Sequence, residues 1–156
     1  MIELKKTTQE DLETLFIFQT NSDGVWMAAF TAEDPNNKKD YMEKWSKIVE
    51  NPNIKMETIR VNNTIVGSVI HFDVMDETNI SYWIDQKYWG KGYATNGLKQ
   101  FISLTRKRPL YARVAFDNYG SQKVLEKCGF KSIGKEKGYA NARKVEIEEF
   151  VYRLEH

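Results

Sequence analysis

Hydrophobic residues in the first third of the chain recur every three or four positions, which is typical of helices that bury one face. The first stripe consists of Leu12, Leu15 and Phe16, and the second of Tyr41, Trp45, Ile48 and Val49. Residues 7–10, just before the first stripe, have the spacing of a capping box. Residues 21–24 are expected to end that helix, residues 25–30 to form a short helix or a loop, and Asp34-Pro35 to begin the helix with the second stripe.

Segments rich in β-branched or alternating residues predict strands. They cover residues 2–4, 55–61, 64–72, 79–85, 109–116, 130–133 and 144–154. Asn62-Asn63 is a hairpin signal, and amphipathic stripes at 93–105 and 119–128 predict helices. Hairpin-linked strands followed by strands separated by helices indicate a mixed α/β sheet. We expect the closing strand, 144–154, to be exposed and able to pair with another copy, so the protein is expected to be a monomer or a homodimer.

The composition suits one domain spanning residues 1–156, with 41% hydrophobic and 29% charged residues. No apolar run approaches the roughly 20 residues needed to cross a bilayer, and residues 1–6 lack the apolar core of a signal peptide. Cys128 is the only cysteine, which excludes an internal disulfide and favours a reducing compartment. We therefore expect a cytoplasmic protein.

Charge is distributed unevenly along the chain. Residues 86–144 carry 14 Lys and Arg against 3 Asp and Glu, a net charge of +11, and the remainder carries 9 against 19, a net charge of −10. This asymmetry indicates that one half binds an anion while the other faces something neutral or cationic. The alternative is that the two halves attract each other.

The segment from Trp89 to Thr95 joins a predicted strand to a predicted helix through a turn with two glycines. Amides at a helix start have no internal partner and lie at the positive end of the helix dipole. Gly90 and Gly92 let the backbone approach an anion closely, and Ala94 keeps the surface small. The pattern predicts a phosphate or pyrophosphate site; the alternative is an ordinary turn that needs glycine for its conformation. The third glycine of a dinucleotide fingerprint and the Gly-Lys-Ser/Thr of a P-loop are both missing.

Two motifs resemble those of the GNAT superfamily of acetyltransferases. Trp89–Ala94 is similar to the hallmark [Arg/Gln]-x-x-Gly-x-[Gly/Ala], matching at Gly92 and Ala94 but with tryptophan in first position. Residues 118–130 are similar to the signature Asn-x-x-Ser…Leu-x-x-x-Gly-Phe. Together with Tyr-Trp-Ile-Asp at 82–85, they resemble the branch of ribosomal-protein N-terminal (alanine or serine) acetyltransferases and related spermidine and antibiotic acetyltransferases.

The resemblance implies a mixed, mostly antiparallel sheet with splayed central strands and flanking helices. It also implies an N-acetyltransferase that moves the acetyl group of acetyl-CoA to a primary amine by direct attack. Backbone groups of Trp83, Ile84 and Asp85 would bind the pantetheine arm like an added strand. The pyrophosphate would be held by the amides of Trp89, Gly90, Lys91, Gly92, Tyr93, Ala94 and Thr95.

On the same resemblance, Asn118 would bind the pantetheine or the acetyl-bearing end. Lys91 and Lys123 could screen phosphate charge, although each alone could equally be a solvated surface residue. Ser121 would serve as the acid for the departing thiolate; its alternative is a hydroxyl in the first helical turn. Many members use a tyrosine seven residues after the asparagine, but here that residue is Leu125, so that role has been lost or moved.

The general base is open at this stage. The family often has a glutamate where this chain has Asn79, and an amide cannot take a proton. Asp73, Asp85 and Glu148 are unranked candidates. His71 is a further candidate, although a lone histidine on a strand is more often structural.

The acceptor is expected to contact aromatic residues near the predicted N-terminal helices, chiefly Trp26, and also Tyr82. The acidic remainder of the chain favours a cationic amine, such as a protein N-terminus, a polyamine or an aminoglycoside. One alternative is a catalytically silent acetyl-CoA-binding module of the same fold. A nucleic-acid-binding domain is the other, but the pI near 7.7 and the scattered lysines argue against it. No metal ion, nucleic acid or membrane is expected to take part.

Overall fold

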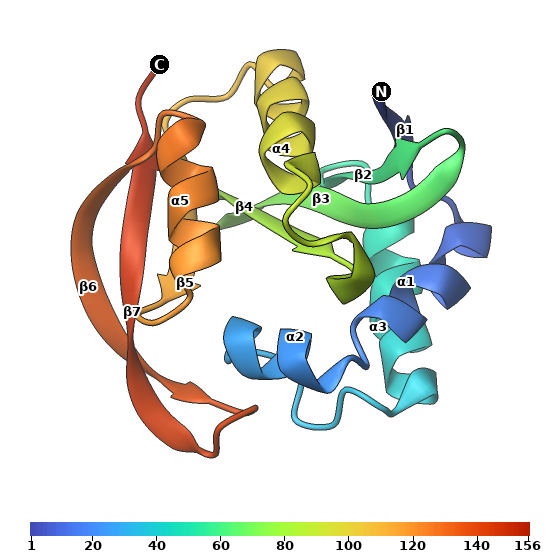
Figure 1. Cartoon of the computed structure of the whole chain (residues 1–156), viewed down its shortest axis with the longest axis horizontal. Coiled ribbons are helices and arrows are strands. Elements are labelled where there is room, and N and C mark those ends of the chain that lie inside the picture. The colour runs from blue at the N-terminus through green and yellow to red at the C-terminus, as the bar shows by residue number, and fades with distance from the viewer.

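The computed structural model describes residues 1–156 as one mixed α/β sheet with helices on both sides (Figure 1). The strands are β1 (Ile2–Lys6), β2 (Lys55–Val61), β3 (Thr64–Val74), β4 (Glu77–Ile84), β5 (Leu110–Ala115), β6 (Lys131–Ala140) and β7 (Val145–Leu154). The α-helices are α1 (Leu12–Phe18), α2 (Ser22–Ala28), α3 (Lys38–Glu50), α4 (Tyr93–Leu104) and α5 (Tyr119–Lys127). Two 3-10 turns, η1 (Gln9–Asp11) and η2 (Gln86–Tyr88), precede α1 and follow β4. No helix is both long enough and apolar enough to cross a membrane.

The seven strands form a single sheet in the order β1-β2-β3-β4-β5-β7-β6. All neighbours are antiparallel except β4 and β5, which confirms the predicted mostly antiparallel sheet. The expectation of an exposed closing strand is wrong, because β7 is paired on both sides: its Phe150 lies opposite Val114 of β5 and Lys135 of β6. The edge strand on this side of the sheet is β6, whose lysines and glutamate discourage pairing with another chain.

The parallel pair β4 and β5 is joined only at its beginning. Thr78 pairs with Leu110 and Asn79 with Tyr111, and no pairing follows, although β4 continues to Ile84 and β5 to Ala115. The two strands therefore diverge, as predicted for splayed central strands. Backbone groups on the facing edges of the divergent parts are left without a neighbouring strand.

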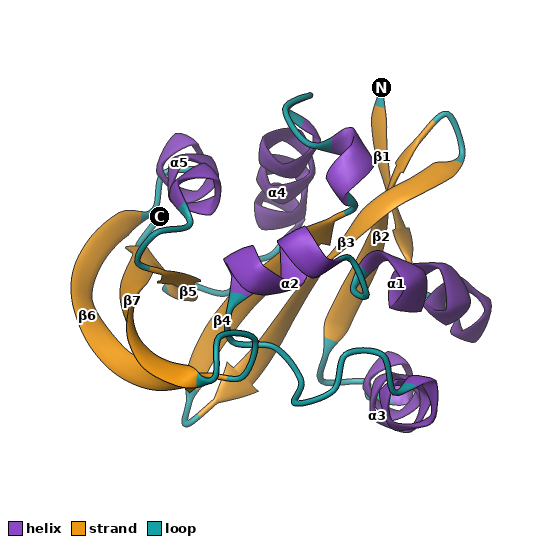
Figure 2. Ribbon diagram, turned by 60° about the horizontal axis from the view of Figure 1, so that its bottom comes forward, coloured by secondary structure: helices purple, strands orange, loops and turns teal.

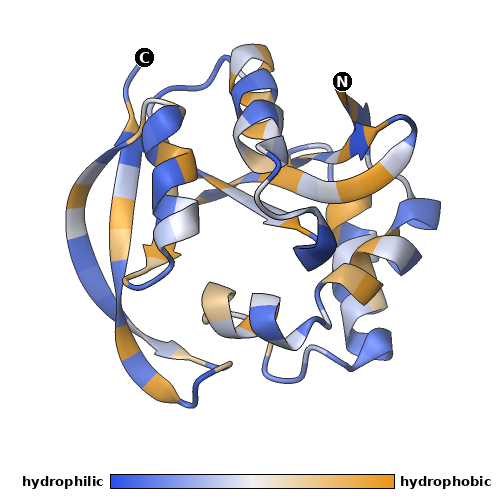
Figure 3. Cartoon of the chain, viewed as in Figure 1, coloured by the Kyte–Doolittle hydropathy of each residue, from blue (hydrophilic) through white to orange (hydrophobic).

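Helices α4 and α5 cover one face of the sheet, and α1 and α3 cover the other (Figure 2). The larger core packs Leu98 and Phe101 of α4 against Ile59 and Val69 of the sheet, all fully buried. Hydrophobic and hydrophilic bands alternate along α4 and α5 (Figure 3), as expected of helices with one buried face. Helix α2 belongs to neither layer. It lies between the two parts of the sheet, β1–β4 and β5–β7, that diverge from each other (Figure 1).

Local boundaries differ from the prediction where side chains cap the backbone. The predicted break after the first helix is present but comes earlier, since α1 ends at Phe18 and residues 22–24 already open α2. The Asn21 side chain starts α2 by accepting a hydrogen bond from the Gly24 amide. Asn37 caps α3 in the same way, so that helix begins at Lys38 instead of Asp34. Strand β3 runs on to Val74 because the positive-φ pair Met75-Asp76 forms the hairpin turn.

Candidate functional site

A cleft of about 930 Å³ opens where β4 and β5 diverge. Its walls include Ser81–Trp83 of β4, Ala112–Ala115 of β5, and Asn118 and Ser121 at the start of α5. The cleft continues through the gap to the opposite face of the sheet, where residues of α1, α3 and the α2–α3 loop line it. One cavity therefore connects the α5 side of the sheet with the side of the N-terminal helices.

The turn before α4 presents a row of amides without partners. The Trp89 amide donates to the Gln86 carbonyl at 3.0 Å, and the first bond of α4 is from the Asn96 amide to the Gly92 carbonyl at 3.0 Å. Between them, the amides of residues 90–95 donate to no acceptor in the chain. Such a row at a helix start binds an anion readily. Trp89 was expected to contribute its amide too, but that amide is already bonded to the Gln86 carbonyl.

The glycines of this turn leave room for a ligand. Gly90 and Gly92 have φ of 77° and 79°, and a Cβ added at Gly90 would meet nothing within 4 Å. Positive φ is open to glycine at little cost, which explains both residues. Lys91 and Lys123 are exposed and take part in no ion pair, so both are free to screen a nearby phosphate.

The end of β4 offers fewer backbone groups to the cleft than predicted. The Asp85 amide donates to the Val66 carbonyl at 3.0 Å, and the Asp85 carbonyl accepts from the Tyr88 amide at 2.9 Å. The Ile84 carbonyl accepts from the Trp89 indole at 2.8 Å. Both backbone groups of Asp85 are therefore already bonded, and Ile84 keeps only its amide free. Trp83 lies on the cleft wall, with its carbonyl directed toward Gly67 of β3.

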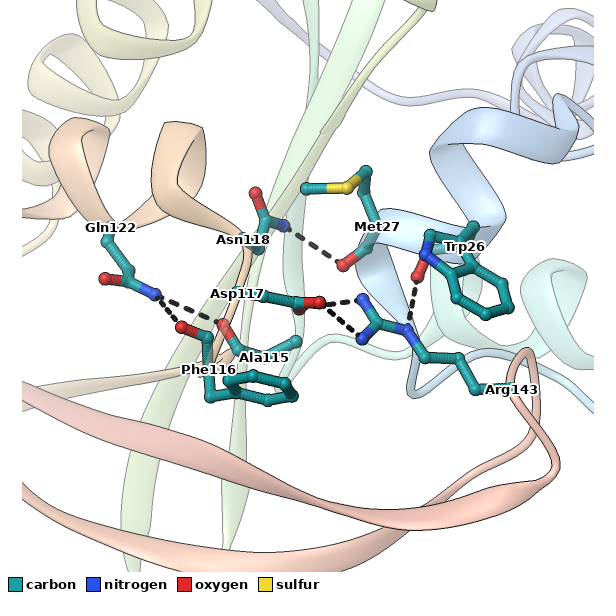
Figure 4. A network of polar contacts seen from close by, with 8 residues as sticks. All are labelled: Trp26, Met27, Ala115, Phe116, Asp117, Asn118, Gln122 and Arg143. Carbon is teal, nitrogen blue, oxygen red and sulfur yellow. Dashed lines mark hydrogen bonds and ion pairs between the residues drawn. The ribbon is translucent and has the colours of Figure 1, made fainter.

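Asn118 is used for structure on both ends of its amide group. Its Oδ1 accepts from the Ser121 amide at 3.2 Å and caps α5, and its Nδ2 donates to the Met27 carbonyl at 3.3 Å (Figure 4). The asparagine was expected to bind the cofactor directly. Its observed bonds instead join α2 to α5 beside the cleft.

Ser121 and Tyr82 form a hydroxyl pair in the cleft. Tyr82 Oη and Ser121 Oγ lie 2.7 Å apart, and both residues line the cavity. Burial raises the pKa of Tyr82 to about 12, so the phenol stays protonated at neutral pH. Leu125 is buried and supplies no hydroxyl. A tyrosine hydroxyl therefore lies beside Ser121, but it comes from β4 and not from α5. Sequence reasoning placed Tyr82 only with the acceptor.

Glu149 of β7 also lines the cleft and was missed from the sequence. Burial raises the pKa of its carboxyl above the ordinary glutamate value, against the opposing effect of Arg113, which donates to it at 3.3 Å. A half-buried carboxylate with a raised pKa is a candidate general base. The alternation along the closing strand puts Glu148 and Glu149 on opposite faces, but only the strand pairing shows which face meets the cleft.

The other base candidates have different surroundings. Asp73 also lines the cleft, but it is exposed and bonded to Thr78 and Lys107, and these hydrogen bonds lower the pKa of its carboxyl. Glu148 forms an ion pair with Lys135 at 3.0 Å. His71 is buried on the α4 face, where its ring lies 5.7 Å from that of Phe101, and it does not line the cleft.

The end of the cleft near the N-terminal helices is aromatic and acidic. Phe30, Tyr41 and Trp45 line it, together with Glu33, Asp34 and Asp40. None of these acids takes part in an ion pair, and Lys44 is the nearby cation on this wall. Trp26 was expected here first, but it lies outside the cleft: its ring stacks on the Arg143 guanidinium, 4.9 Å away.

Comparisons with known proteins agree with this arrangement. The family model described as "Acetyltransferase (GNAT) domain" matches residues 2–131. A search of curated protein sequences finds no match.

Solved structures with the same fold include three named acetyltransferases. The microcin C7 self-immunity acetyltransferase MccE, in complex with acetyl-CoA and AMP, is 20% identical with a TM-score of 0.81, covering 99% of this chain and 92% of that one. Spermidine N-acetyltransferase from Vibrio cholerae, in complex with CoA and spermine, is 15% identical with a TM-score of 0.80 and coverages of 99% and 95%. Ribosomal-protein-S5-alanine acetyltransferase from Vibrio fischeri is 16% identical with a TM-score of 0.78 and coverages of 99% and 92%.

At such identities the structural likeness shows the fold, and the match of the family model over residues 2–131 shows the family: the chain belongs to the GNAT acetyltransferases.

Proposed function

We propose that this protein transfers the acetyl group of acetyl-CoA to a primary amine on a cationic acceptor. The observation that carries the proposal is the row of unpartnered amides at residues 90–95, next to a gap between two strands that leads into the cleft. An anion at the turn and an extended arm in the gap are what these two features accommodate together. Structures of the same fold contain acetyl-CoA or CoA.

The residues present fit the coenzyme. The free amides from Gly90 to Thr95 would hold its pyrophosphate, and the exposed Lys91 and Lys123 would screen its charge. The Ile84 amide, which faces away from β3 because the neighbouring Asp85 amide bonds to Val66, would lie along the pantetheine arm in the gap. When bound, the coenzyme would supply an acetyl thioester for the amine to attack.

The hydroxyl pair would supply the proton that the departing sulfur needs. Ser121 Oγ can hold a proton toward the gap, and Tyr82 Oη, 2.7 Å away, can replace it. Because the pKa of Tyr82 is about 12, the phenol keeps its proton at neutral pH and can donate it to Ser121. Ser121 thereby keeps the role that its motif implies, with Tyr82 behind it.

Glu149 would take the proton of the incoming ammonium group. Below its raised pKa the carboxyl is protonated and cannot accept, so activity should fall as the pH drops through that value. We expect Glu149→Gln to lower kcat/KM about tenfold at neutral pH and to remove this acidic limb. Steady-state pH profiles measure both, with Glu148→Gln on the other face as the control. An unchanged acidic limb in Glu149→Gln would exclude this role.

Acceptor choice would follow from the acidic, aromatic end of the cleft. Carboxylates and aromatic faces both attract ammonium groups, and Glu33, Asp34 and Asp40 have no cationic partners in ion pairs. Mass spectrometry of polyamines, aminoglycosides, peptides and neutral amines incubated with acetyl-CoA tests the proposal. Acetylation restricted to neutral or acidic amines would contradict it. Coenzyme binding without any acetylation would favour the catalytically silent module.

Gly92→Ala should weaken coenzyme A binding about tenfold. The residue has φ of 79°, and an added Cβ would meet only Asn96 Nδ2, at 4.0 Å, so the change strains the turn without a clash inside the protein. Titration calorimetry with coenzyme A measures the effect, and Gly134→Ala, where an added Cβ also meets nothing within 4 Å and φ is not positive, is the matched control. Equal affinities of the two variants would show that the turn does not hold the ligand.

A further inference from the structure

Helix α2 crosses the open part of the gap between β4 and β5, and its N-terminal end is tied to the β4 side. Asn21 Nδ2 donates to Gln86 Oε1 at 2.7 Å, and Gln86 Nε2 donates to Asp23 Oδ2 at 2.9 Å. Gln86 begins η2, two residues after the end of β4. Gly24 allows a close approach to the same strand, since a Cβ there would lie 3.0 Å from Cζ2 of Trp83. This end of α2 is therefore anchored to the β4 side of the gap.

The C-terminal end of α2 is tied to the β5 side by different elements. Asn118 Nδ2, just after β5, donates to the Met27 carbonyl at 3.3 Å. The turn between β6 and β7 adds two bonds: the Ala142 amide donates to the Ala29 carbonyl at 3.1 Å, and Arg143 Nε donates to the Trp26 carbonyl at 3.0 Å. The helix thus bridges the two sides of the gap.

Arg143 makes more of these contacts than any other side chain at this end (Figure 4). Its side chain is only 5% exposed. Nη1 and Nη2 donate to the two carboxylate oxygens of Asp117 at 2.7 and 2.8 Å, and the guanidinium stacks on the Trp26 ring. This bidentate pairing lowers the pKa of Asp117 and keeps it ionised. A cation at the last carbonyls of a helix is also favoured by the helix dipole.

The Arg143 contacts lead directly to the hydroxyl pair. Asp117 precedes Asn118, whose Oδ1 caps the Ser121 amide at 3.2 Å, and Ser121 Oγ lies 2.7 Å from Tyr82 Oη on β4. A chain of bonds therefore runs from the β6–β7 turn, through the loop after β5 and the start of α5, to the opposite strand of the gap. A shift of the 117–118 loop would move Ser121 relative to Tyr82.

We infer that Arg143 is a positioning residue for acetyl transfer: it fastens α2 and the 117–118 loop to each other and so sets the distance across the gap at which Ser121 meets Tyr82. Arg143 does not line the cleft. The effect on catalysis rests on the proposed function, whereas the effect on α2 does not. Because small displacements in a catalytic site are costly, a side chain outside the cleft can still govern the rate.

The test compares Arg143→Met, Arg143→Lys and Arg153→Met. The last is the matched control, since Arg153 lies on β7 outside the cleft and pairs with Glu155. Hydrogen exchange of the free proteins, followed by mass spectrometry, should show α2 amides exchanging about tenfold faster in Arg143→Met, with α4 unchanged. For the same variant, kcat/KM should fall about tenfold, mainly in kcat. Arg143→Lys should recover part of both, because one ammonium keeps the charge but not the two-point bond.

Protection of the α4 amides shows that a variant has folded. If Arg143→Met does not fold, Asp117→Asn replaces it, because this change weakens the same ion pair from the carboxylate side. Exchange of α2 that is unaffected by Arg143, an equal effect of Arg153→Met, or faster exchange with kcat/KM within about twofold of the wild type would each overturn the inference. If the wild-type protein transfers no acetyl group, Arg143-dependent exchange of α2 would support the bridge and count against the proposed function alone.

Discussion

Tyr82→Phe should lower kcat for acetyl transfer about a hundredfold and leave KM for acetyl-CoA nearly unchanged. The change removes the hydroxyl 2.7 Å from Ser121 Oγ and keeps the ring that packs between β4 and α5. A proton donor acts on the departing group and not on the bound coenzyme, so the loss belongs in kcat. Because the pKa of Tyr82 is about 12, the deficit should stay constant across the neutral pH range.

The Ser121→Ala variant and the double variant separate a relay from two independent effects. If the hydroxyls act as one unit, the double variant should be no slower than the slower single variant. Tyr152→Phe is the matched control, since Tyr152 is a buried tyrosine on β7 that does not line the cleft. A Tyr82→Phe enzyme within about twofold of wild-type kcat would show that the proton comes from elsewhere.

Gly67→Ala should destabilise the protein by about 3 kcal/mol, the largest stability loss that we expect from a single methyl group. An added Cβ would lie 2.1 Å from the Trp83 carbonyl oxygen and 2.8 Å from Cδ1 of Ile84. A side chain could rotate away, but a backbone carbonyl can move only with its strand. Strands β3 and β4 must therefore separate where Gly67 pairs with Ile84.

Urea denaturation of Gly67→Ala and of Gly134→Ala measures this effect, since nothing lies within 4 Å of a Cβ at Gly134. Coenzyme A binding should weaken as well, because displacement of β4 moves Tyr82 and Trp83, which line the cleft, out of their positions. A free energy of unfolding within about 0.5 kcal/mol of the wild type would mean that β4 tolerates the shift.

The position of the proton donor illustrates how the family pattern and this chain differ. Leu125 stands where many members are expected to have tyrosine, and it is buried in the core beneath α5. Tyr82 reaches the same region from the opposite side of the gap and meets Ser121. We expect the Tyr82 hydroxyl to do the work of the tyrosine that is missing at position 125, although it comes from a different strand.

Local features of the chain could be predicted from the sequence because neighbouring residues determine them. The hydrophobic periods predicted α4 and α5 to within about a residue, and Asn62-Asn63 predicted the hairpin between β2 and β3. The free amides at the Gly90–Gly92 turn follow from a helix start, whose first amides have no carbonyl to bond in any fold. The motifs in residues 89–130 were sufficient to predict the family.

Tertiary structure alone decided which side chains face the cleft. Alternation along a strand puts Glu148 and Glu149 on opposite faces, and does the same for His71 and its neighbours. It cannot tell which of the two faces meets a cavity. That depends on the pairing of β7 with β5 and of β3 with β4. The resemblance assigned Asn118 to the cofactor, and its bond to the Met27 carbonyl could not be foreseen because that bond joins segments distant in sequence. Trp26 lies outside the cleft because Arg143, more than a hundred residues later, stacks on its ring. Such contacts join segments that are far apart in the sequence and meet only in the folded sheet, so no short stretch of sequence encodes them.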